Sequence, residues 1–304
     1  MATGTILVTG ANGFVGRHVV RELLARGRHV VCFVKRGTDD TPLRGLDVEV
    51  RAGDLRDRGS VVSAVAGAEA VIHLAAAVNV PTDQYDAVNV LGAANIAAAC
   101  RENRVDRLIA YSSVTVTRAR MGAYGRTKKE AERVLGEAGL NTTVFRPELI
   151  YGVGSPGLGK IARQVRAYPL FIPVVGRGDT VLQPVYVKDI ARLTADTVED
   201  PLSHGKVYDV GGRDPVSARE LILAVAREMG VGKRLLHVPP SIALVAAYGL
   251  GVALRSPPFT VDNMLGLMVP NNNDVQRTFD ELGFSPTPLA DALRETFREW
   301  HPSL

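Results

Sequence analysis

Residues 6–16 read Ile6-Leu-Val-Thr-Gly-Ala-Asn-Gly-Phe-Val-Gly16, and this stretch decides the fold of the chain. The apolar run at its start predicts a buried strand, and an apolar pattern with helical spacing follows the glycines. Gly10 permits a tight turn at the strand end, Gly13 allows a pyrophosphate to approach the backbone, and Gly16 lets the helix pack closely on the strand. Because the start of a helix presents free N–H groups and a positive dipole end, this turn is typical of dinucleotide binding.

The glycines are spaced Gly-x-x-Gly-x-x-Gly, and residues 9–16 resemble the short-chain dehydrogenase/reductase superfamily in its extended and atypical branches, the NAD-dependent epimerase/dehydratase-like proteins. The resemblance covers nearly the whole chain. It implies an α/β fold with a doubly wound parallel sheet (Rossmann) and a smaller C-terminal α/β substrate domain. Residues 1–150 are then the dinucleotide-binding domain, to which residues 182–200 return, and residues 151–304 are the substrate domain. In the turn, the implied cofactor-binding residues are Gly10, Asn12, Gly13, Phe14, Val15 and Gly16.

Composition excludes several other classes of protein. The 304 residues are 46% hydrophobic, which is enough for one large domain or two tightly joined ones. Cys32 and Cys100 lie in apolar segments and are read as buried thiols of a cytoplasmic protein without a signal peptide. The net charge of +4 is scattered among acids, so we expect no nucleic-acid partner. The histidines and cysteines are too dispersed for a metal site.

The end of the second predicted strand bears on cofactor choice. NAD-binding folds place an acidic residue there to accept the ribose hydroxyls. Here Val34 is followed by Lys35 and Arg36, and arginine donates in pairs to phosphate. We therefore expect NADP rather than NAD as cofactor, with Lys35 and Arg36 at the 2′-phosphate. A merely polar strand end is the alternative.

The third and fourth predicted strands carry further cofactor contacts by resemblance. Asp54 is expected to accept from the adenine amino group and Leu55 to supply a backbone contact; a helix N-cap is the other reading of Asp54, and both can hold together. The fourth strand ends in His73-Leu-Ala-Ala76, similar to the family's signature, so Leu74, Ala75 and Ala76 are expected against the dinucleotide. His73 itself is expected to be buried and hydrogen-bonded rather than catalytic.

Polar residues flank the mouth of this predicted site. Asn79 and Val80 are candidates for the nicotinamide or substrate side. Asn89 occupies the position at which family members stabilise the active-site backbone.

The chemistry is assigned to Ser113, Tyr124 and Lys128. Tyr124 and Lys128 are four residues apart on a predicted helix and so share a face. A nearby ammonium favours the phenolate, which brings the tyrosine pKa down from about 10 toward the working range of a base. The trio resembles the superfamily's Ser-Tyr-Lys triad, in which the lysine also binds the nicotinamide ribose and the serine holds the substrate oxygen. Ser112 is the alternative serine, and an isolated Tyr-x-x-x-Lys pair is common by chance.

One departure keeps a non-catalytic reading open. Only ten residues separate Ser113 from Tyr124, fewer than is usual in extended members. The short loop resembles the atypical branch, which includes NADPH-binding subunits related to a respiratory complex I component. Many atypical proteins have lost the tyrosine, but this chain retains it.

The C-terminal half carries weaker signals. Pro147 is implied beside the nicotinamide, and Glu148 is either a pocket carboxylate or a solvated acid. Leu182 and Gln183 stand where nucleotide-sugar enzymes commonly have a phosphate-binding arginine, which weakens that reading. Asp189 is expected to cap a helix.

Residues 241–254 form an uncharged run that is too short to span a bilayer, which takes about 20 residues. They are a packing helix or an interfacial membrane contact. By resemblance, an alanine-rich face from Ala93 to Ala99 and the tyrosine helix predict a homodimer.

Together these features predict an NADP-dependent oxidoreductase that acts on a carbonyl or secondary alcohol of a small molecule. In this mechanism Tyr124 transfers the proton, Lys128 tunes it and Ser113 orients the substrate. The alternatives are a nucleotide-sugar epimerase or dehydratase, and a non-catalytic NADPH-binding subunit. The substrate, the reaction direction and the roles of Glu148 and the 241–254 run stay open.

Overall fold

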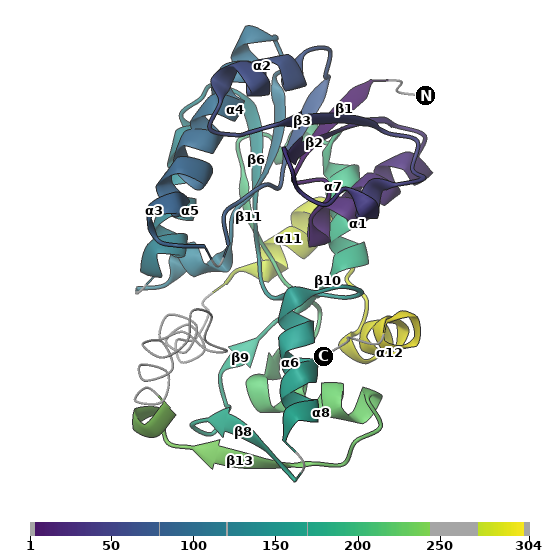
Figure 1. Cartoon of the computed structure of the whole chain (residues 1–304), viewed down its shortest axis with the longest axis vertical. Helices are drawn as coiled ribbons and strands as arrows, with labels where there is room; N and C mark the ends of the chain where they lie inside the picture. The colour runs from purple at the N-terminus through teal and green to yellow at the C-terminus, as the bar shows by residue number, and fades with distance from the viewer. Residues whose placement is uncertain (1–3, 79, 120, 169, 244–272, 301–304) are drawn as a thin grey trace.

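Seven parallel strands form the centre of the structure, which is a computed structural model (Figure 1). The structure describes residues 4–78, 80–119, 121–168, 170–243 and 273–300. The strand order is β11-β6-β5-β4-β1-β2-β3, so the predicted doubly wound sheet is confirmed. The strands are β1 Thr5–Thr9, β2 His29–Lys35, β3 Glu49–Gly53, β4 Ala70–His73, β5 Arg107–Tyr111, β6 Asn141–Pro147 and β11 Val207–Val210.

Helices cover both faces of the sheet because its strands are apolar on both sides. One face packs against α1 (Phe14–Ala25) and α7 (Val187–Thr197). The other packs against α2 (Arg58–Val65), α4 (Leu91–Glu102) and α5 (Gly122–Gly136). A three-residue helix α3 (Asp83–Tyr85) and a π-helical turn (Asp86–Val90) lead into α4.

The chain order reverses between β1 and β4, which lie side by side in the sheet. The carboxyl edge at this point of reversal is where open α/β sheets bind ligands, in a crevice between the segments that follow the two strands. The glycine turn follows β1 and residues 74–77 follow β4, so both reach this crevice.

A second hydrophobic cluster lies beyond the carboxyl edge of the sheet (Figure 1). It packs α6 (Pro156–Ala167), α8 (Ala218–Glu228) and α12 (Leu289–Glu299) together. Short strand pairs complete this part: β7 Ile150–Tyr151 with β10 Val185–Tyr186, β8 Phe171–Val175 with β13 Arg234–Val238, and β9 Val181–Leu182 with β12 Val216–Ser217.

One placement differs from the sequence prediction. Residues 207–210 were assigned to the substrate domain, but β11 pairs with β6 and forms the edge of the main sheet. The next described helix after residue 272, α11 (Val275–Leu282), packs on β11, where the Thr278 hydroxyl donates to the Asp209 carbonyl at 2.6 Å. The chain therefore returns to the sheet twice after residue 150, first through α7 and β11 and then through α11. Within the described ranges, no helix is long and apolar enough to cross a bilayer.

Candidate active site

The turn after β1 has the geometry that its glycines predict. Gly10 has a left-handed φ of 68°, and a Cβ there would lie 2.9 Å from the Ala75 backbone. A Cβ on Gly16 would lie 2.1 Å from the Gly10 carbonyl oxygen. Both positions therefore require glycine, because any other residue would push α1 or residue 75 away.

Helix α1 begins without a capping side chain. Gly13 is its N-cap, is exposed and makes no side-chain cap bond, and half-buried Phe14 and Val15 follow. The amide of Asn12 donates to the Thr38 hydroxyl at 3.0 Å and to a backbone carbonyl at 2.9 Å, which ties the turn to the loop after β2. The first N–H groups of α1 are left without a side-chain acceptor, an arrangement that fits the phosphates of a dinucleotide.

Lys35 and Arg36 are exposed at the end of β2. Within the described part of the chain neither forms a salt bridge, although Arg36 Nε lies 3.5 Å from the Ala52 carbonyl oxygen. The charge of Lys35 acts on the Asp54 carboxylate and helps to lower its pKa.

Asp54 is engaged by a neighbouring arginine. Its carboxylate accepts from the Arg56 guanidinium at 2.6 Å and from the Arg56 backbone N–H at 2.9 Å. These bonds hold the pKa of Asp54 down at about 2. The N-cap reading of Asp54 is wrong: Asp57 caps α2 by accepting from the N–H groups of Gly59 and Ser60.

Leu55 and residues 74–76 follow β3 and β4 at the carboxyl edge of the sheet. Leu55 is buried, and its carbonyl accepts from the Asn95 amide at 2.7 Å. Leu74, Ala75 and Ala76 are half-buried after β4, and the Ala75 N–H donates to the Thr9 hydroxyl at 3.2 Å.

His73 is buried and hydrogen-bonded, as predicted. Its Nδ1 lies 2.8 Å from the Thr9 hydroxyl oxygen. Burial lowers the pKa of His73 to about 3, with a smaller contribution from the charge of Lys128. The imidazole is therefore neutral near pH 7 and serves as a structural partner of Thr9.

Asn89 joins this crevice to helix α5. The Asn89 carbonyl oxygen accepts from the Ala77 N–H at 2.8 Å, and its amide donates to the Thr127 hydroxyl at 3.1 Å. The predicted backbone support is thus present. Val80 is half-buried, and Asn79 lies outside the described residues.

Ser113 and Tyr124 meet at the carboxyl edge next to β5. The Tyr124 hydroxyl lies near the Ser113 side chain. The Ser113 hydroxyl accepts from the Thr115 hydroxyl at 3.0 Å. The Tyr124 ring packs edge-on against Tyr85, with ring centroids 6.1 Å apart. Burial raises the pKa of Tyr124 to about 12, although the nearby Ser113 side chain lowers the pKa of the phenol in part. The sequence predicted a lowered pKa for Tyr124, because a nearby lysine would stabilise the phenolate. The pKa is raised instead.

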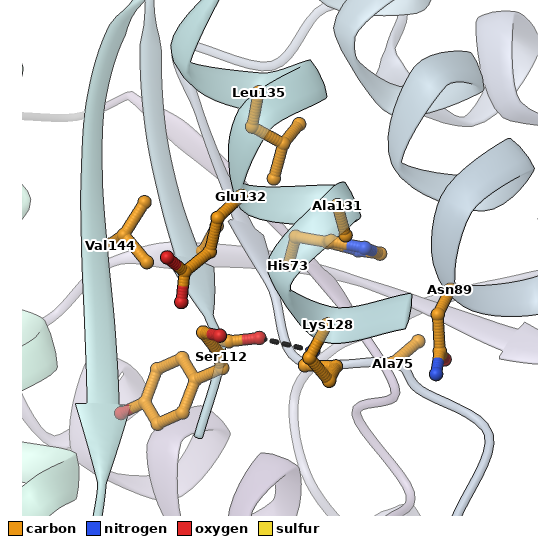
Figure 2. Close-up of a pocket in the computed structure, with 11 residues that line it drawn as sticks. His73, Ala75, Asn89, Ser112, Lys128, Ala131, Glu132, Leu135 and Val144 are labelled. Carbon is orange, nitrogen blue, oxygen red and sulfur yellow. Dashed lines mark hydrogen bonds between the residues drawn. The ribbon is translucent and has the colours of Figure 1, made fainter. Parts of the chain in front are cut away.

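The position of Lys128 explains why the pKa of Tyr124 is not lowered, because the Lys128 ammonium points into the interior of the fold. Nζ donates to the Tyr111 carbonyl oxygen (Figure 2). The Lys128 side chain is buried, one turn along α5 from Tyr124. Burial lowers the pKa of Lys128 to about 8, against an opposing contribution from the Glu132 carboxylate. Lys128 therefore lies beside the sheet rather than beside the phenol.

A small internal cavity of about 10 Å³ lies next to Lys128, close to the size of one water molecule. Its lining includes His73, Asn89, Ser112 and Glu132 (Figure 2). The Ser112 hydroxyl is buried and has no hydrogen-bond partner among the described residues. Ser112 thus faces Lys128 from within the fold, whereas Ser113 faces Tyr124 at the edge.

Glu132 and Arg146 were missed by the sequence reading. The Arg146 guanidinium donates to the Glu132 carboxylate at 2.9 and 2.5 Å, and it lies 3.9 Å from Asp209 on β11. Glu132 follows Lys128 by four residues on α5, so helical spacing could have identified it as a neighbour of the lysine. Its arginine partner on β6 comes from the tertiary fold.

Two acids in the C-terminal half are now placed. Pro147 ends β6, and Glu148 is buried and accepts from the Asn273 amide, so it is not a solvated acid. The cap prediction for Asp189 is wrong: α7 has no side-chain cap bond. The Asp189 carboxylate is buried and accepts from Thr287 N–H and Oγ1 at 2.7 and 2.8 Å, which anchors the segment before α12.

Comparison with known proteins agrees with this geometry. Residues 6–211 match the NAD dependent epimerase/dehydratase family. The chain is 32% identical over 278 residues to 2-alkyl-3-oxoalkanoate reductase of Stenotrophomonas maltophilia, covering 81% of each chain. It is 32% identical over 248 residues to ceramide reductase of Caulobacter vibrioides, covering 81% of this chain and 77% of that one. The solved structure of MoeE5 with UDP-glucuronic acid and NAD superposes with a TM-score of 0.74 at 25% identity, covering 97% and 98%.

The chain therefore belongs to the NAD-dependent epimerase/dehydratase family. It is an enzyme of the NAD(P)-dependent oxidoreductase/epimerase type within the short-chain dehydrogenase/reductase superfamily.

Proposed function

We propose that this protein is an NADP-dependent reductase that converts a carbonyl to a secondary alcohol. The observation that carries the proposal is the proximity of the Tyr124 hydroxyl to the Ser113 side chain at the carboxyl edge of the sheet, the edge at which the glycine turn also lies. The reductases among its relatives point the same way, since both names given above are those of reductases.

In this proposal the bound nicotinamide supplies the hydride to the carbonyl carbon. Ser113 donates a hydrogen bond to the substrate oxygen, and Tyr124 transfers its hydroxyl proton to that oxygen as the alkoxide forms. The Tyr124 phenol is protonated near pH 7, as a proton donor in the reductive direction must be. Lys128 is proposed to reach the nicotinamide ribose once it leaves the Tyr111 carbonyl.

The cofactor residues of the proposal surround the crevice. The N–H groups that open α1 would hold the pyrophosphate, at Gly13, Phe14 and Val15. Lys35 and Arg36 would hold the 2′-phosphate of NADP, because both are exposed cations at the end of β2. The remaining proposed contacts are Gly10, Asn12, Gly16, Asp54, Leu55, Leu74, Ala75, Ala76, Lys128 and Pro147.

The direct test follows nicotinamide absorbance with purified protein, NADPH and a panel of ketones and 3-oxo acid derivatives. We expect oxidation of NADPH with part of the panel and slower oxidation of NADH. Binding of NADPH without turnover on any carbonyl would instead support the second candidate, a non-catalytic NADPH-binding subunit. The inward-turned Lys128 is the observation that favours that candidate. A nucleotide-sugar epimerase is weakened by Leu182 and Gln183, which carry no charge.

A homodimer through α4 and α5 remains a proposal. Ala93, Ala97 and Ala99 are buried within the chain, so only part of the alanine-rich face points outward. Leu91 is exposed, and Ala94 and Ala98 are half-buried on the same helix. A stripe of small residues permits close helix approach, and light scattering at micromolar concentration would show twice the monomer mass.

A further inference from the structure

A surface pocket of about 390 Å³ lies where helix α1 meets the second hydrophobic cluster. Its walls come from α1, from the loop after β2, from residues 153 and 154 before α6, and from Trp300 at the end of α12. Figure 1 shows α1 and α12 on the same side of the molecule. The volume lies within the range of about 300–1,000 Å³ that small-molecule sites occupy.

The pocket lies farther along α1 than the proposed pyrophosphate site. Gly13 is the N-cap of α1, whereas Arg17, His18 and Arg21 line the pocket. At 1.5 Å of rise per residue, Arg21 starts about 12 Å along the helix from Gly13. A dinucleotide whose pyrophosphate lies at the first N–H groups of α1 would therefore leave the Arg21 end of the pocket open.

Arg17 is fixed in the wall of the pocket by backbone contacts. Its Nη2 donates to the Val153 carbonyl oxygen at 2.7 Å. Gly154 has a left-handed φ of 79°, and a Cβ there would lie 1.7 Å from the same nitrogen. The guanidinium also lies over the Phe14 ring, 5.8 Å from its centroid. A guanidinium has five N–H donors, so a fixed Arg17 can still donate to an anion.

Arg21 adds a second cation to the same pocket. Arg21 is exposed, and its Nη2 lies 3.5 Å from the Pro42 carbonyl oxygen. Among the described residues neither Arg17 nor Arg21 forms a salt bridge, and the nearby Glu22 pairs with Arg26. Burial lowers the pKa of Arg17, and the charge of Arg21 lowers it further. An anion bound beside the two like charges would stabilise both.

One acidic residue, Asp39, also lines the pocket, but its carboxylate is engaged within its own loop. It accepts from the Thr41 N–H at 2.9 Å. Hydrogen bonds from Thr41 lower the pKa of Asp39, and the charge of Arg44, outside the pocket, makes a smaller contribution. Asp39 therefore closes the loop after β2 rather than pairing with the arginines of the pocket.

His18 is an uncharged part of the lining. Its Nε2 lies 3.3 Å from the Val153 carbonyl oxygen, so Nε2 is the nitrogen that donates in the neutral ring. Burial lowers the pKa of His18 to about 4, and the charges of the two arginines and of Lys188 lower it further. The imidazole is therefore neutral near pH 7, and Arg17 and Arg21 supply the positive charge of the pocket.

Flat apolar side chains complete the lining. Pro42 and Trp300 both border the pocket, and both are half-buried. An indole offers a large flat surface on which an aromatic ring can pack, and a guanidinium also stacks on aromatic planes. The pocket thus combines two cations with flat apolar walls.

We propose that this pocket binds a phosphate monoester that carries an aromatic group. The phosphate would lie beside Arg17 and Arg21, since a planar guanidinium donates to phosphate oxygens in pairs, and the ring would lie against Trp300. The volume selects an ester over a bare anion, because a single phosphate ion would leave most of the pocket to water. The site does not need the cofactor or the reaction proposed above, so the two proposals can fail separately.

Trp300 makes the test direct, because the sequence contains one tryptophan. The test is a titration of the full chain with phenyl phosphate, followed by tryptophan fluorescence excited beyond the absorption of the phenyl ring. We expect a saturable change with phenyl phosphate, weaker binding of inorganic phosphate and no saturable change with phenol. Inorganic phosphate lacks the ring and phenol lacks the phosphate, so these two probes separate the two halves of the site.

Arg21→Ala should weaken phenyl phosphate binding by at least about tenfold, the loss expected for one charge-assisted hydrogen bond. The matched control Arg26→Ala removes an arginine from the same end of α1 that pairs with Glu22, and it should leave binding unchanged. Arg36→Ala is a second control, because it removes a cation of the proposed 2′-phosphate site that does not line this pocket. It should also leave phenyl phosphate binding unchanged.

Four outcomes would overturn the proposal. One is the absence of a saturable change with phenyl phosphate. Another is binding that Arg21→Ala leaves intact. A third is binding that Arg36→Ala abolishes, because the ligand would then occupy the cofactor site and act on Trp300 indirectly. Equal affinities for inorganic phosphate and phenyl phosphate would overturn the assignment of an aromatic ester.

Discussion

The glycine turn after β1 and the start of helix α5 lie at the same edge of the sheet, but they reach their geometry in different ways. The turn is made of backbone: Gly10 and Gly16 fix it by contacts that no Cβ could tolerate. The site at α5 is made of long side chains, and Lys128 donates to the Tyr111 carbonyl rather than turning to Tyr124. A backbone site thus has its binding geometry before any ligand arrives, whereas a side-chain site can change with rotamer and ligand.

The largest expected effect tests the side-chain site at the start of α5. Tyr124→Phe removes only the hydroxyl that lies near Ser113. If Tyr124 is the proton donor, turnover should fall by about 10²–10⁴, while NADPH affinity stays nearly constant. Steady-state rates and calorimetric titration of the cofactor would measure the two quantities. The control Tyr85→Phe keeps the ring that packs against Tyr124 and should retain most of the activity. Unchanged turnover in Tyr124→Phe would remove Tyr124 from the mechanism.

The next effect tests the backbone site, the glycine turn after β1. Gly16→Ala places a Cβ 2.1 Å from the Gly10 carbonyl oxygen, so α1 must move away from β1. We expect the free energy of unfolding to drop by about 3 kcal/mol, at the upper end of overpacking costs. Gly136→Ala in α5 is the control: nothing lies within 4 Å of its added Cβ, and stability should stay equal or rise by up to about 1 kcal/mol. Urea titration distinguishes them, and equal midpoints would show that the turn is not fixed by close packing.

A smaller effect concerns Lys35 and Arg36, the cations at the end of β2. Arg36→Ala should weaken NADPH binding by about 1.5–3 kcal/mol, the value of a charge-assisted hydrogen bond, and leave NADH binding unchanged. Arg44→Ala removes a nearby exposed arginine that is paired with Asp40, and it should affect neither cofactor. Calorimetry with both cofactors measures the difference. Equal affinity of the unaltered protein for NADPH and NADH would contradict the assignment of NADP.

The smallest effect concerns Glu132, whose negative charge raises the pKa of Lys128 and so counteracts the lowering that burial causes. Glu132→Gln should lower the pKa of Lys128 below its value of about 8, by about 1 unit for the loss of a neighbouring opposite charge. If the charged lysine binds the cofactor, NADPH affinity should decline with rising pH, and the midpoint should move down by that amount. Glu130→Gln, on the exposed side of the same helix, should leave the midpoint in place.

Stability should change with pH in the opposite sense. Because the folded pKa of Lys128 is depressed, the unfolded chain binds more protons between about pH 8 and the ordinary lysine value of about 10.4. Stability therefore rises with pH across this window, and Glu132→Gln should extend the rise to lower pH. If the pH midpoint of NADPH binding is the same in the unaltered protein, in Glu132→Gln and in Glu130→Gln, then Glu132 does not tune the pKa of Lys128.

Much of the site followed from local pattern. The strand–turn–helix at residues 6–16 needs glycine at fixed spacings, and such steric requirements can be read from the sequence. The buried state of His73 and the support from Asn89 followed in the same way, from the strand and helix on which they lie.

The errors share a cause. Asp54 and Asp189 were both given local capping roles, yet Asp57 caps α2, and Asp189 binds Thr287, almost one hundred residues further along the chain. Residues 207–210 were placed away from the sheet because the short strand carries no signal of its partner. Partners that are distant in sequence decide these positions.

The sequence by itself determined the parallel α/β fold and the tight glycine turn after β1, because both rest on glycine sterics and on the periodicity of apolar residues. Only the tertiary structure decided where the charges of the site point: Lys128 toward the Tyr111 carbonyl, and Glu132 toward Arg146 on β6. The physical reason is that a long charged side chain takes its direction from whichever buried partner the fold brings within reach, and helical spacing fixes only the residue from which it starts.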